Sequence, residues 1–296
     1  MRGRHPVFLY DPGSRRSPVQ SRRSPLTSRP ELLVDILDLE RIEVDIFRGR
    51  SPEEGPQRVF GGQVAGQALV AAGRTVPAER AVHSLHAYFI RAGDPEVPIV
   101  YTVDRTRDGR SFSTRRVTAI QHGQAIFTLS ASFHHPETGL EHQVPMPEAP
   151  DPERLPERSR GLRPVEIRYA GEPPWALDGQ AREPRSMVWM RARGPLPDDP
   201  LVHVCAVAYA SDMSLLDSVL LAHGLNWNAE GLTAASLDHA MWFHGPFRAD
   251  EWLLYAQESP AASGARGLAQ GRIFRRDGRL IASVVQEGLI RWNPGR

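Results

Sequence analysis

The sequence contains one order of secondary-structure patterns twice, and this repetition limits the folds that are open to it. The first copy begins with a strand pattern at 39–47 and a helical pattern in which Val64, Ala68 and Ala72 share one face. Strand patterns follow at 83–90, 99–106, 113–120 and 124–133. The second copy has the same order, with a strand pattern at 185–193, a helical pattern at 201–223, and strand patterns at 233–244, 251–259, 267–275 and 280–291.

Matching turns support the repeat. The turn Asp277-Gly278 follows His122-Gly123 by 155 positions, and Ser236-Leu237 follows Ser84-Leu85 by 152. A helix followed by an antiparallel meander buries its apolar face against that sheet. We therefore predict an α+β fold of two tandem antiparallel sheets, each wrapping a central helix, which pair side by side into one body.

The prolines divide the chain into regions. Thirteen of the 26 prolines lie between residues 136 and 200, which is typical of an irregular connection. We expect an N-terminal domain at 31–135, a proline-rich linker at 136–184 and a C-terminal domain at 185–296. Residues 1–30 are rich in Arg, Pro and Ser without apolar periodicity, so we expect this extension to be disordered.

The net charge of +1 is the sum of two unlike parts. Residues 1–30 hold seven Arg and one acid, which gives this segment +6 and the remainder −5. A slightly acidic body disfavours nucleic acid as a partner. All 36 basic residues are Arg, which excludes Schiff-base and P-loop lysine chemistry. The Arg- and Ser-rich start also resembles a transit peptide, but it lacks an amphipathic helical pattern.

The single cysteine and the hydropathy pattern narrow the setting. Cys205 excludes an internal disulfide and a cysteine-based zinc site, and its apolar neighbours predict a buried packing role. Apolar runs are too short for a transmembrane helix, and the N-terminus lacks the apolar segment of a signal peptide. We expect a cytoplasmic protein without stable membrane insertion.

Polar residues stand at two positions where the patterns predict apolar core. At an offset of 155, Gln286 occupies the place that Ala131 has in the first copy. A buried amide costs about 1–3 kcal/mol unless it is hydrogen-bonded, so Gln286 requires a partner. Asp212 likewise extends the apolar stripe that Leu215 and Leu216 form. The alternative is that Asp212 caps a helix that begins near Met213.

A hydroxyl follows on the next strand. Alternation does not decide whether Ser236 faces inward, because Ser236, Asp238, Ala240 and Trp242 form a mixed set. Taken alone, Ser236 is more simply interpreted as a structural hydroxyl. An acid, an amide and a hydroxyl that converge between sheet and helix could nevertheless bind and orient one water, with the acid taking its proton.

Several motifs carry a resemblance to a known family. The chain strongly resembles the type II acyl-CoA thioesterases over most of residues 31–294, in both halves. The matching segments are Arg58-Val-Phe-Gly-Gly-Gln-Val-Ala-Gly-Gln67, His83-Ser-Leu-His-Ala-Tyr-Phe89, Arg107-Asp-Gly-Arg-Ser-Phe112, Ser211-Asp212-Met213, Leu237-Asp-His-Ala-Met-Trp-Phe-His244 and Val285-Gln-Glu-Gly288. The resemblance implies a double hot-dog fold and hydrolysis of fatty acyl-CoA to a free fatty acid and CoA, without a cofactor.

The resemblance also implies a set of catalytic residues. In that family an Asp, a Thr or Ser, and a Gln activate the attacking water without a covalent acyl-enzyme. By motif position these roles fall to Asp212, Ser236 and Gln286. Many members have Thr where this chain has Ser236, so the hydroxyl is kept but the methyl group that restricts its rotamer is lost.

Candidates for substrate binding are less specific. Gly62 could present helix N–H groups to the thioester oxygen or merely permit close packing. His83 could line the site, and Arg110 and Arg266 are candidates for the CoA phosphates because Arg is the only long cation in the chain. The histidine pairs lack a metal-binding spacing, so we expect no metal.

Two alternative functions are compatible with this sequence, and we also expect self-association. A hot-dog acyl-CoA hydratase or dehydratase would share the fold, with His239 beside Asp238 as a weak acid–base pair because adjacent strand residues point oppositely. A non-catalytic acyl-CoA-binding protein is the second alternative. We expect a homo-oligomer, because hot-dog sheets commonly pair further.

Overall fold

The computed structural model describes residues 32–52, 58–157, 164–176 and 179–295, so the predicted N-terminal extension at 1–30 lies outside the described residues. The first copy comprises helices α1 and α2 and strands β1 to β6. Their bounds are α1 Leu33–Leu37, β1 Glu40–Glu43, β2 Ile46–Gly49, α2 Gly61–Gly73, β3 Ala81–Phe89, β4 Ile99–Asp108, β5 Phe112–Gln121 and β6 Gln124–His134.

The second copy repeats this order with additions. It comprises β7 Val165–Tyr169, β8 Arg185–Ala192, α3 Pro200–Ser211, α4 Asp217–Leu221, β9 Leu232–Ser236, β10 Asp238–Phe243, β11 Leu253–Ser263, β12 Arg266–Arg275 and β13 Leu280–Trp292. Two short 3-10 helices, Pro152–Arg154 and Pro174–Ala176, lie in the connection between the copies. Strand β7, which pairs with β8, also lies in the stretch that we predicted as a linker.

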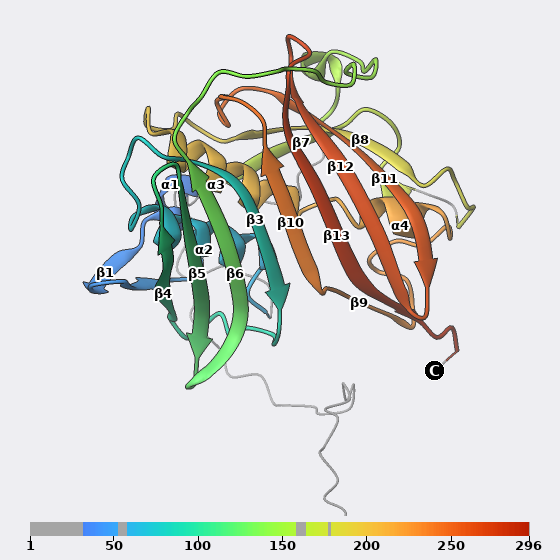
Figure 1. Cartoon of the computed structure of the whole chain (residues 1–296). Coiled ribbons are helices and arrows are strands. Elements are labelled where there is room, and N and C mark those ends of the chain that lie inside the picture. Colours follow the sequence, from blue (N-terminus) through green and yellow to red (C-terminus); the bar gives the residue numbers. More distant parts are fainter. Residues whose placement is uncertain (1–31, 53–57, 158–163, 177–178, 296) are drawn as a thin grey trace, which may run out of the picture.

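The two copies form one continuous antiparallel sheet in place of two separate ones. Its order is β1-β2-β4-β5-β6-β3-β10-β13-β12-β11-β8-β7, with β9 paired to β13 (Figure 1). Counted inward from each end, the strands follow the same order, so β3 and β10 are equivalent edges that meet. Their pairing, for example Met241 with Leu85, joins the halves through main-chain hydrogen bonds.

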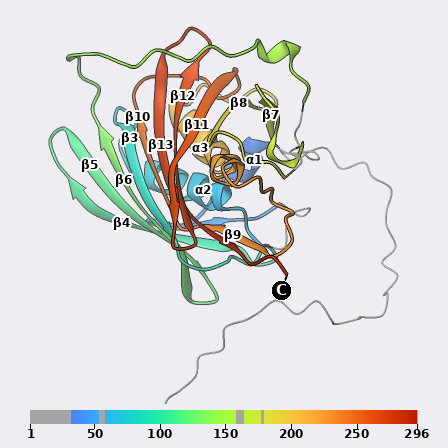
Figure 2. The same ribbon diagram turned by 90° about the vertical axis from the view of Figure 1, so that its right-hand side faces the viewer.

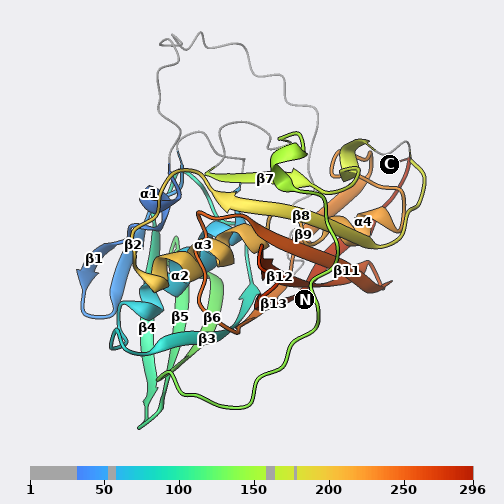
Figure 3. The same ribbon diagram turned by 90° about the horizontal axis from the view of Figure 1, so that it is seen from above.

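Helices α2 and α3 lie together on the inner side of the curved sheet (Figures 2 and 3). They run antiparallel, because Gly62 lies against the carbonyl of Tyr209 and Gly66 against that of Cys205. A Cβ at Gly62 would lie 2.2 Å from the Tyr209 oxygen, so only glycine permits this approach. The N-terminus of α2 therefore meets the C-terminus of α3. Cys205 is buried at this contact, as its neighbours predicted.

The alternation predicted for 124–133 is confirmed from Phe127 onward, whereas Ile126 is buried in place of Ala125 at the start of β6. Phe127, Leu129, Ala131 and Phe133 are each 1% exposed, while the intervening residues are more exposed. These residues face the core that contains α2 and α3. Burial of one sheet face against two helices accounts for the apolar periodicity in both copies.

The second helical pattern is broken, contrary to the continuous helix expected at 201–223. Helix α3 ends at Ser211 and α4 begins at Asp217. The Ser218 hydroxyl, in the first turn of α4, donates to the carbonyl of Leu215 in the segment between the two helices at 2.8 Å. In the part of the chain that the structure describes, no helix is long and apolar enough to cross a membrane.

Candidate active site

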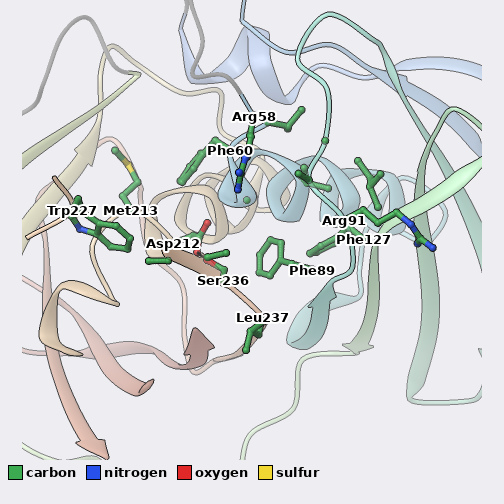
Figure 4. A pocket seen from close by; sticks show the side chains of 18 of the residues that line it. Arg58, Phe60, Phe89, Arg91, Phe127, Asp212, Met213, Trp227, Ser236 and Leu237 are labelled. Atoms are coloured by element: carbon green, nitrogen blue, oxygen red, sulfur yellow. Dashed lines mark hydrogen bonds between the residues drawn. The ribbon is translucent and has the colours of Figure 1, made fainter. Parts of the chain in front are cut away.

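A cavity of about 690 Å³ opens where the two copies meet (Figure 4). Its wall includes the N-terminus of α2, the turn after α3 and strand β9, and it therefore draws on both halves. Asp212 and Ser236 lie in the wall near its centre. This volume lies within the usual range for small-molecule pockets.

Asp212 is placed by the antiparallel helices. It is the C-cap of α3, so the alternative of an N-cap for a following helix is wrong. The backbone N–H of Gly62, in the first turn of α2, donates to its carboxylate. A Cβ at Gly61 would lie 2.5 Å from Asp212 Oδ2, so glycine is needed for this approach as well. The first copy thus supplies a helix N-terminus, with its partial positive charge, to an acid of the second copy.

Ser236 is directed into the cavity by a β-bulge. Ser236 pairs with Gly288 whereas Ala240 pairs with Val285, so four residue steps on β9 and β10 face three on β13. The extra residue reverses the alternation, which is a common way to re-aim a side chain near a site. This is why strand parity along 233–244 could not show which side Ser236 faces.

Gln286 joins Asp212 and Ser236 into one hydrogen-bonded cluster. Its Nε2 donates to Asp212 Oδ1 and to Ser236 Oγ, both at 2.7 Å. The Ser236 hydroxyl donates to the same Asp212 oxygen at 2.8 Å. Gln286 is 0% exposed and reaches the cavity through the other two residues. The structure therefore brings together the three residues that the sequence singled out.

A fourth polar residue, His239, extends this cluster into the core. His239 is buried, and its Nδ1 lies 3.2 Å from Gln286 Oε1 while its Nε2 lies 2.8 Å from Ser211 Oγ. An amide oxygen only accepts, so we assign the ring proton to Nδ1. The Ser211 hydroxyl lies within hydrogen-bond distance of both His239 Nε2 and the Ala208 carbonyl, the latter at 3.0 Å. Sequence reasoning considered His239 only as an acid–base partner of Asp238. In the structure the Asp238 carboxylate accepts from the Glu287 N–H instead.

Burial shifts the two ionisable groups of the cluster in opposite senses. It raises the pKa of the Asp212 carboxyl, although the bonds from Ser236, Gln286 and Gly62 oppose that rise. Burial lowers the pKa of His239, which favours the neutral ring. A carboxylate with a raised pKa is a stronger base than an exposed one.

The sequence candidates for substrate binding are placed unevenly. Gly62 touches the cluster through its N–H. His83 bonds Ser132 at 2.8 Å and lies among aromatic side chains of the first copy, outside the described cavity wall. Arg266 pairs with Glu287 at 2.9 Å, and neither it nor the exposed Arg110 belongs to that wall.

Other residues of the wall were not anticipated. Arg58 and Arg91 both line the cavity, and Arg58 stands inside a motif that we had used only for the resemblance. Asp217 lines it too, and is buried with hydrogen bonds from Tyr169 at 2.7 Å and Trp227 at 2.5 Å. An acid in an apolar helical run was the available signal for Asp217. Among the described residues, no group of three or more His, Cys, Asp or Glu is arranged to hold a metal ion.

Comparison with known proteins gives consistent matches. The family model described as acyl-CoA thioesterase matches residues 159–289, and that described as acyl-CoA thioesterase N-terminal domain matches residues 49–134. Acyl-coenzyme A thioesterase 8 of Mus musculus is 45% identical over 295 residues, covering 90% of this chain and 91% of its own. Acyl-CoA thioesterase 2 of Haemophilus influenzae is 42% identical over 281 residues, covering 88% of this chain and 97% of its own.

Solved structures agree on the architecture. An acyl-CoA thioesterase II, TesB2, from Mycobacterium marinum has a TM-score of 0.78 at 50% identity, covering 89% of this chain and 100% of its own. A protein from Alicyclobacillus acidocaldarius described as having a hot dog fold has a TM-score of 0.72 at 20% identity, covering 88% of this chain and 98% of its own, and it supports the fold alone. The double hot-dog prediction is thus confirmed, and the chain belongs to the acyl-CoA thioesterase family.

Proposed function

We propose that this chain hydrolyses fatty acyl-CoA by direct attack of water, with Asp212 as the general base. The observation that carries the proposal is the cluster of Asp212, Ser236 and Gln286 in the wall of a cavity of about 690 Å³. Membership of the acyl-CoA thioesterase family supports the substrate class.

The proposed hydrolysis proceeds in two steps, and Asp212 carries the proton from one to the other. Asp212 takes a proton from a water held between it and Ser236, and the water oxygen bonds to the thioester carbon. The carbon–sulfur bond then breaks, and the proton passes from Asp212 to the departing sulfur. The products are a fatty acid and CoA with a free thiol. In this scheme water is the nucleophile, so no residue of the cluster forms a covalent acyl-enzyme.

The three residues have different roles in this scheme. Asp212 and Ser236 are exposed to the cavity, so they contact the water. Gln286 is fully buried, and it orients Asp212 and Ser236 without needing to reach the substrate. We assign Gln286 as a positioning residue. Gly61, the first residue of α2, lies in the cavity wall, where the helix N-terminus can stabilise the negative charge that develops on the thioester oxygen.

Release of free thiol from short, medium and long acyl-CoAs tests the activity. We expect Asp212→Asn to lower kcat at least about 10²-fold, the usual contribution of a general base. The matched control is Asp104→Asn, which alters an exposed acid on β4. Near-native turnover by Asp212→Asn would contradict the assignment. Saturable acyl-CoA binding without thiol release would favour a non-catalytic binding protein, and hydration of an enoyl-CoA would favour a hydratase.

We further infer a cytoplasmic homo-oligomer. The family supports neither point by itself, and both remain predictions. Light scattering of the purified protein tests the oligomer, since a molar mass equal to that of one chain would contradict it. Fractionation of cells that express the full chain tests the location.

A further inference from the structure

The cavity differs chemically on its two sides. In Figure 4, Met213 and Trp227 lie to one side of Asp212, and Arg91 lies to the other. Arg58 stands at the upper edge of the site in the same view. The reacting position is therefore flanked by a side with Trp227 and the acid Asp217, the aromatic side, and a side with guanidinium groups, on which Phe89 and Phe127 also lie. A substrate with one apolar arm and one anionic arm fits such a cavity in one direction better than in the other.

The guanidinium groups are available for an anion. Arg91 donates Nη1 to the carbonyl of Ala125 at 2.7 Å, which fixes its side chain. Within the described residues, no carboxylate forms an ion pair with Arg58 or Arg91, whereas Arg266 pairs with Glu287. Guanidinium groups bind phosphates through charge-assisted hydrogen bonds. The phosphates of CoA are joined to the thioester by the long pantetheine arm, so a site displaced from Asp212 is required.

The aromatic side suits a hydrocarbon chain and disfavours phosphate. Its wall contains the apolar side chains Ile167, Tyr169, Trp175, Met213 and Trp227. Asp217 is a buried part of this wall and accepts hydrogen bonds from Tyr169 and Trp227, which holds both rings in place. A carboxylate here repels a phosphate but does not hinder an acyl chain that packs on the rings.

We propose that acyl-CoA lies in the cavity with its phosphates on the side of Arg58 and Arg91 and its acyl chain against Trp227. This orientation rests on the proposed function. It makes the two arginines the phosphate-binding residues of the chain, in place of Arg110 and Arg266. It also makes Trp227, held by Asp217, a residue that sets the preferred acyl length.

Removal of each guanidinium tests the phosphate side. Arg91→Gln and Arg58→Gln are assayed with one acyl group on CoA and on pantetheine, which lacks the CoA phosphates. We expect KM for acyl-CoA to rise about tenfold, the size of one charge-assisted hydrogen bond, with less than a twofold change for acyl-pantetheine. Arg91→Lys, which keeps the charge, should recover part of the loss. The control is Arg116→Gln, an exposed arginine on β5 outside the described cavity wall.

Truncation of the aromatic wall tests the acyl side. Trp227→Ala is assayed with acyl chains from short to long on both carriers. We expect kcat/KM to shift toward longer chains by about tenfold relative to short ones, equally for CoA and pantetheine thioesters. Trp227→Phe keeps an aromatic wall and should shift the profile less.

The outcomes separate this orientation from the activity itself. An equal rise in KM for both carriers in the arginine variants, or no rise in either, overturns the phosphate assignment. A Trp227→Ala effect on the ratio of CoA to pantetheine thioesters, without a change in chain preference, reverses the direction. If the wild-type chain releases no thiol, the proposed function fails. Calorimetric binding of CoA and of pantetheine to the same variants then decides the orientation without turnover, and circular dichroism confirms that each variant is folded.

Discussion

The two halves place different residues at the same level of the sheet. In the first half Arg115 on β5 pairs with Ala131 on β6, and in the second half Ala269 on β12 pairs with Gln286 on β13. Each pair therefore has one alanine and one buried polar residue, but the polar residue is on the other strand. At this equivalent strand pair, each copy therefore buries one polar side chain.

In the first half this polar group supports the fold. Arg115 is 1% exposed and donates to Thr75 Oγ1 and the Thr75 carbonyl, just beyond the C-terminus of α2. It also donates to Asp108 at 2.8 Å. These bonds satisfy the Thr75 carbonyl in the turn that follows the helix. The described cavity wall does not include Arg115.

In the second half the polar group serves the proposed chemistry. Gln286 donates to Asp212, the C-cap of α3, whereas the C-cap of α2 is Arg74. His239, which bonds Gln286, corresponds by sheet register to Leu85, which pairs with Ala131. One half thus uses its buried polar residue as a structural support, and we propose that the other half uses it in catalysis. Neither half is sufficient, because the N–H of Gly62 comes from the first.

We expect the largest effect from substitution of Arg115, the buried polar residue that supports the fold of the first half. Arg115→Ala leaves a cavity and removes the partner of Asp108 and of the Thr75 carbonyl, so we expect the free energy of unfolding to fall by about 3–5 kcal/mol. Chemical denaturation measures the loss. The kcat of the protein that remains folded should be unchanged. A large fall in kcat without a loss of stability would mean that the two halves do not divide these roles.

The acids of the two halves should titrate in opposite senses. Burial raises the pKa of Asp217 to about 6, from an ordinary value of 3.8. Between these values the folded state binds more protons than the unfolded state, so its stability falls as pH rises. Relative to wild type, Asp217→Asn should gain about 3 kcal/mol between pH 4 and pH 7. Denaturation across this pH range measures the difference.

Asp108, an exposed acid of the first half, provides the control. A hydrogen bond from Ser113, together with Arg115, lowers the pKa of Asp108. Its contribution to stability is present above the ordinary pKa and is lost as pH falls. Asp108→Asn should therefore lose stability relative to wild type as pH rises, with the opposite slope. Equal slopes for the Asp108 and Asp217 variants would contradict the comparison.

Gln286→Ala gives the second half the same residue that the first half has at the equivalent position, Ala131. We expect kcat to fall about 10²-fold, because Asp212 and Ser236 lose the amide that orients them. The free energy of unfolding should change less than in Arg115→Ala. Steady-state kinetics and denaturation of the two variants, measured together, test the contrast, and a native kcat would remove Gln286 from the mechanism.

The smallest effect concerns His239. His239→Leu copies Leu85 and removes the N–H that orients the Gln286 amide, so we expect kcat to fall about tenfold with KM unchanged. The pH dependence should stay that of wild type, because the ring is neutral and donates no proton to substrate. His239→Gln, which retains an N–H donor, should recover part of the rate. Loss of an ionisation from the pH–rate profile would instead make His239 a general acid or base.

The repeated order of elements, the apolar faces and the polar residues that interrupt them could all be predicted from the amino-acid sequence. Alternation along β6 and the turn spacing were enough for this, because burial of one face imposes a regular period on the chain. Asp212 and Gln286 could be found because they break that period. The family motifs then attached Ser236 to them.

Only the tertiary structure decided how these residues meet. The bulge between Ser236 and Ala240 depends on pairing with β13, which local alternation does not specify. For that reason, Ser84-Leu85 is not the counterpart of Ser236-Leu237. His239, beside Gln286 in the second copy, takes the place that Leu85 has beside Ala131 in the first. The break after Ser211 likewise depends on tertiary contacts such as the bond from Gln257 to Ser214.

The set of residues that line the cavity was also visible only in the folded structure. Arg58, Arg91 and Trp227 are distant in sequence and carry no common pattern, yet all three line one cavity because β3 and β10 join the halves. Arginines proposed only because they are long cations, such as Arg266, could not be separated by sequence from those in the wall. The period of a chain reports which face is buried, whereas the neighbours across a sheet or helix pair are set by long-range packing.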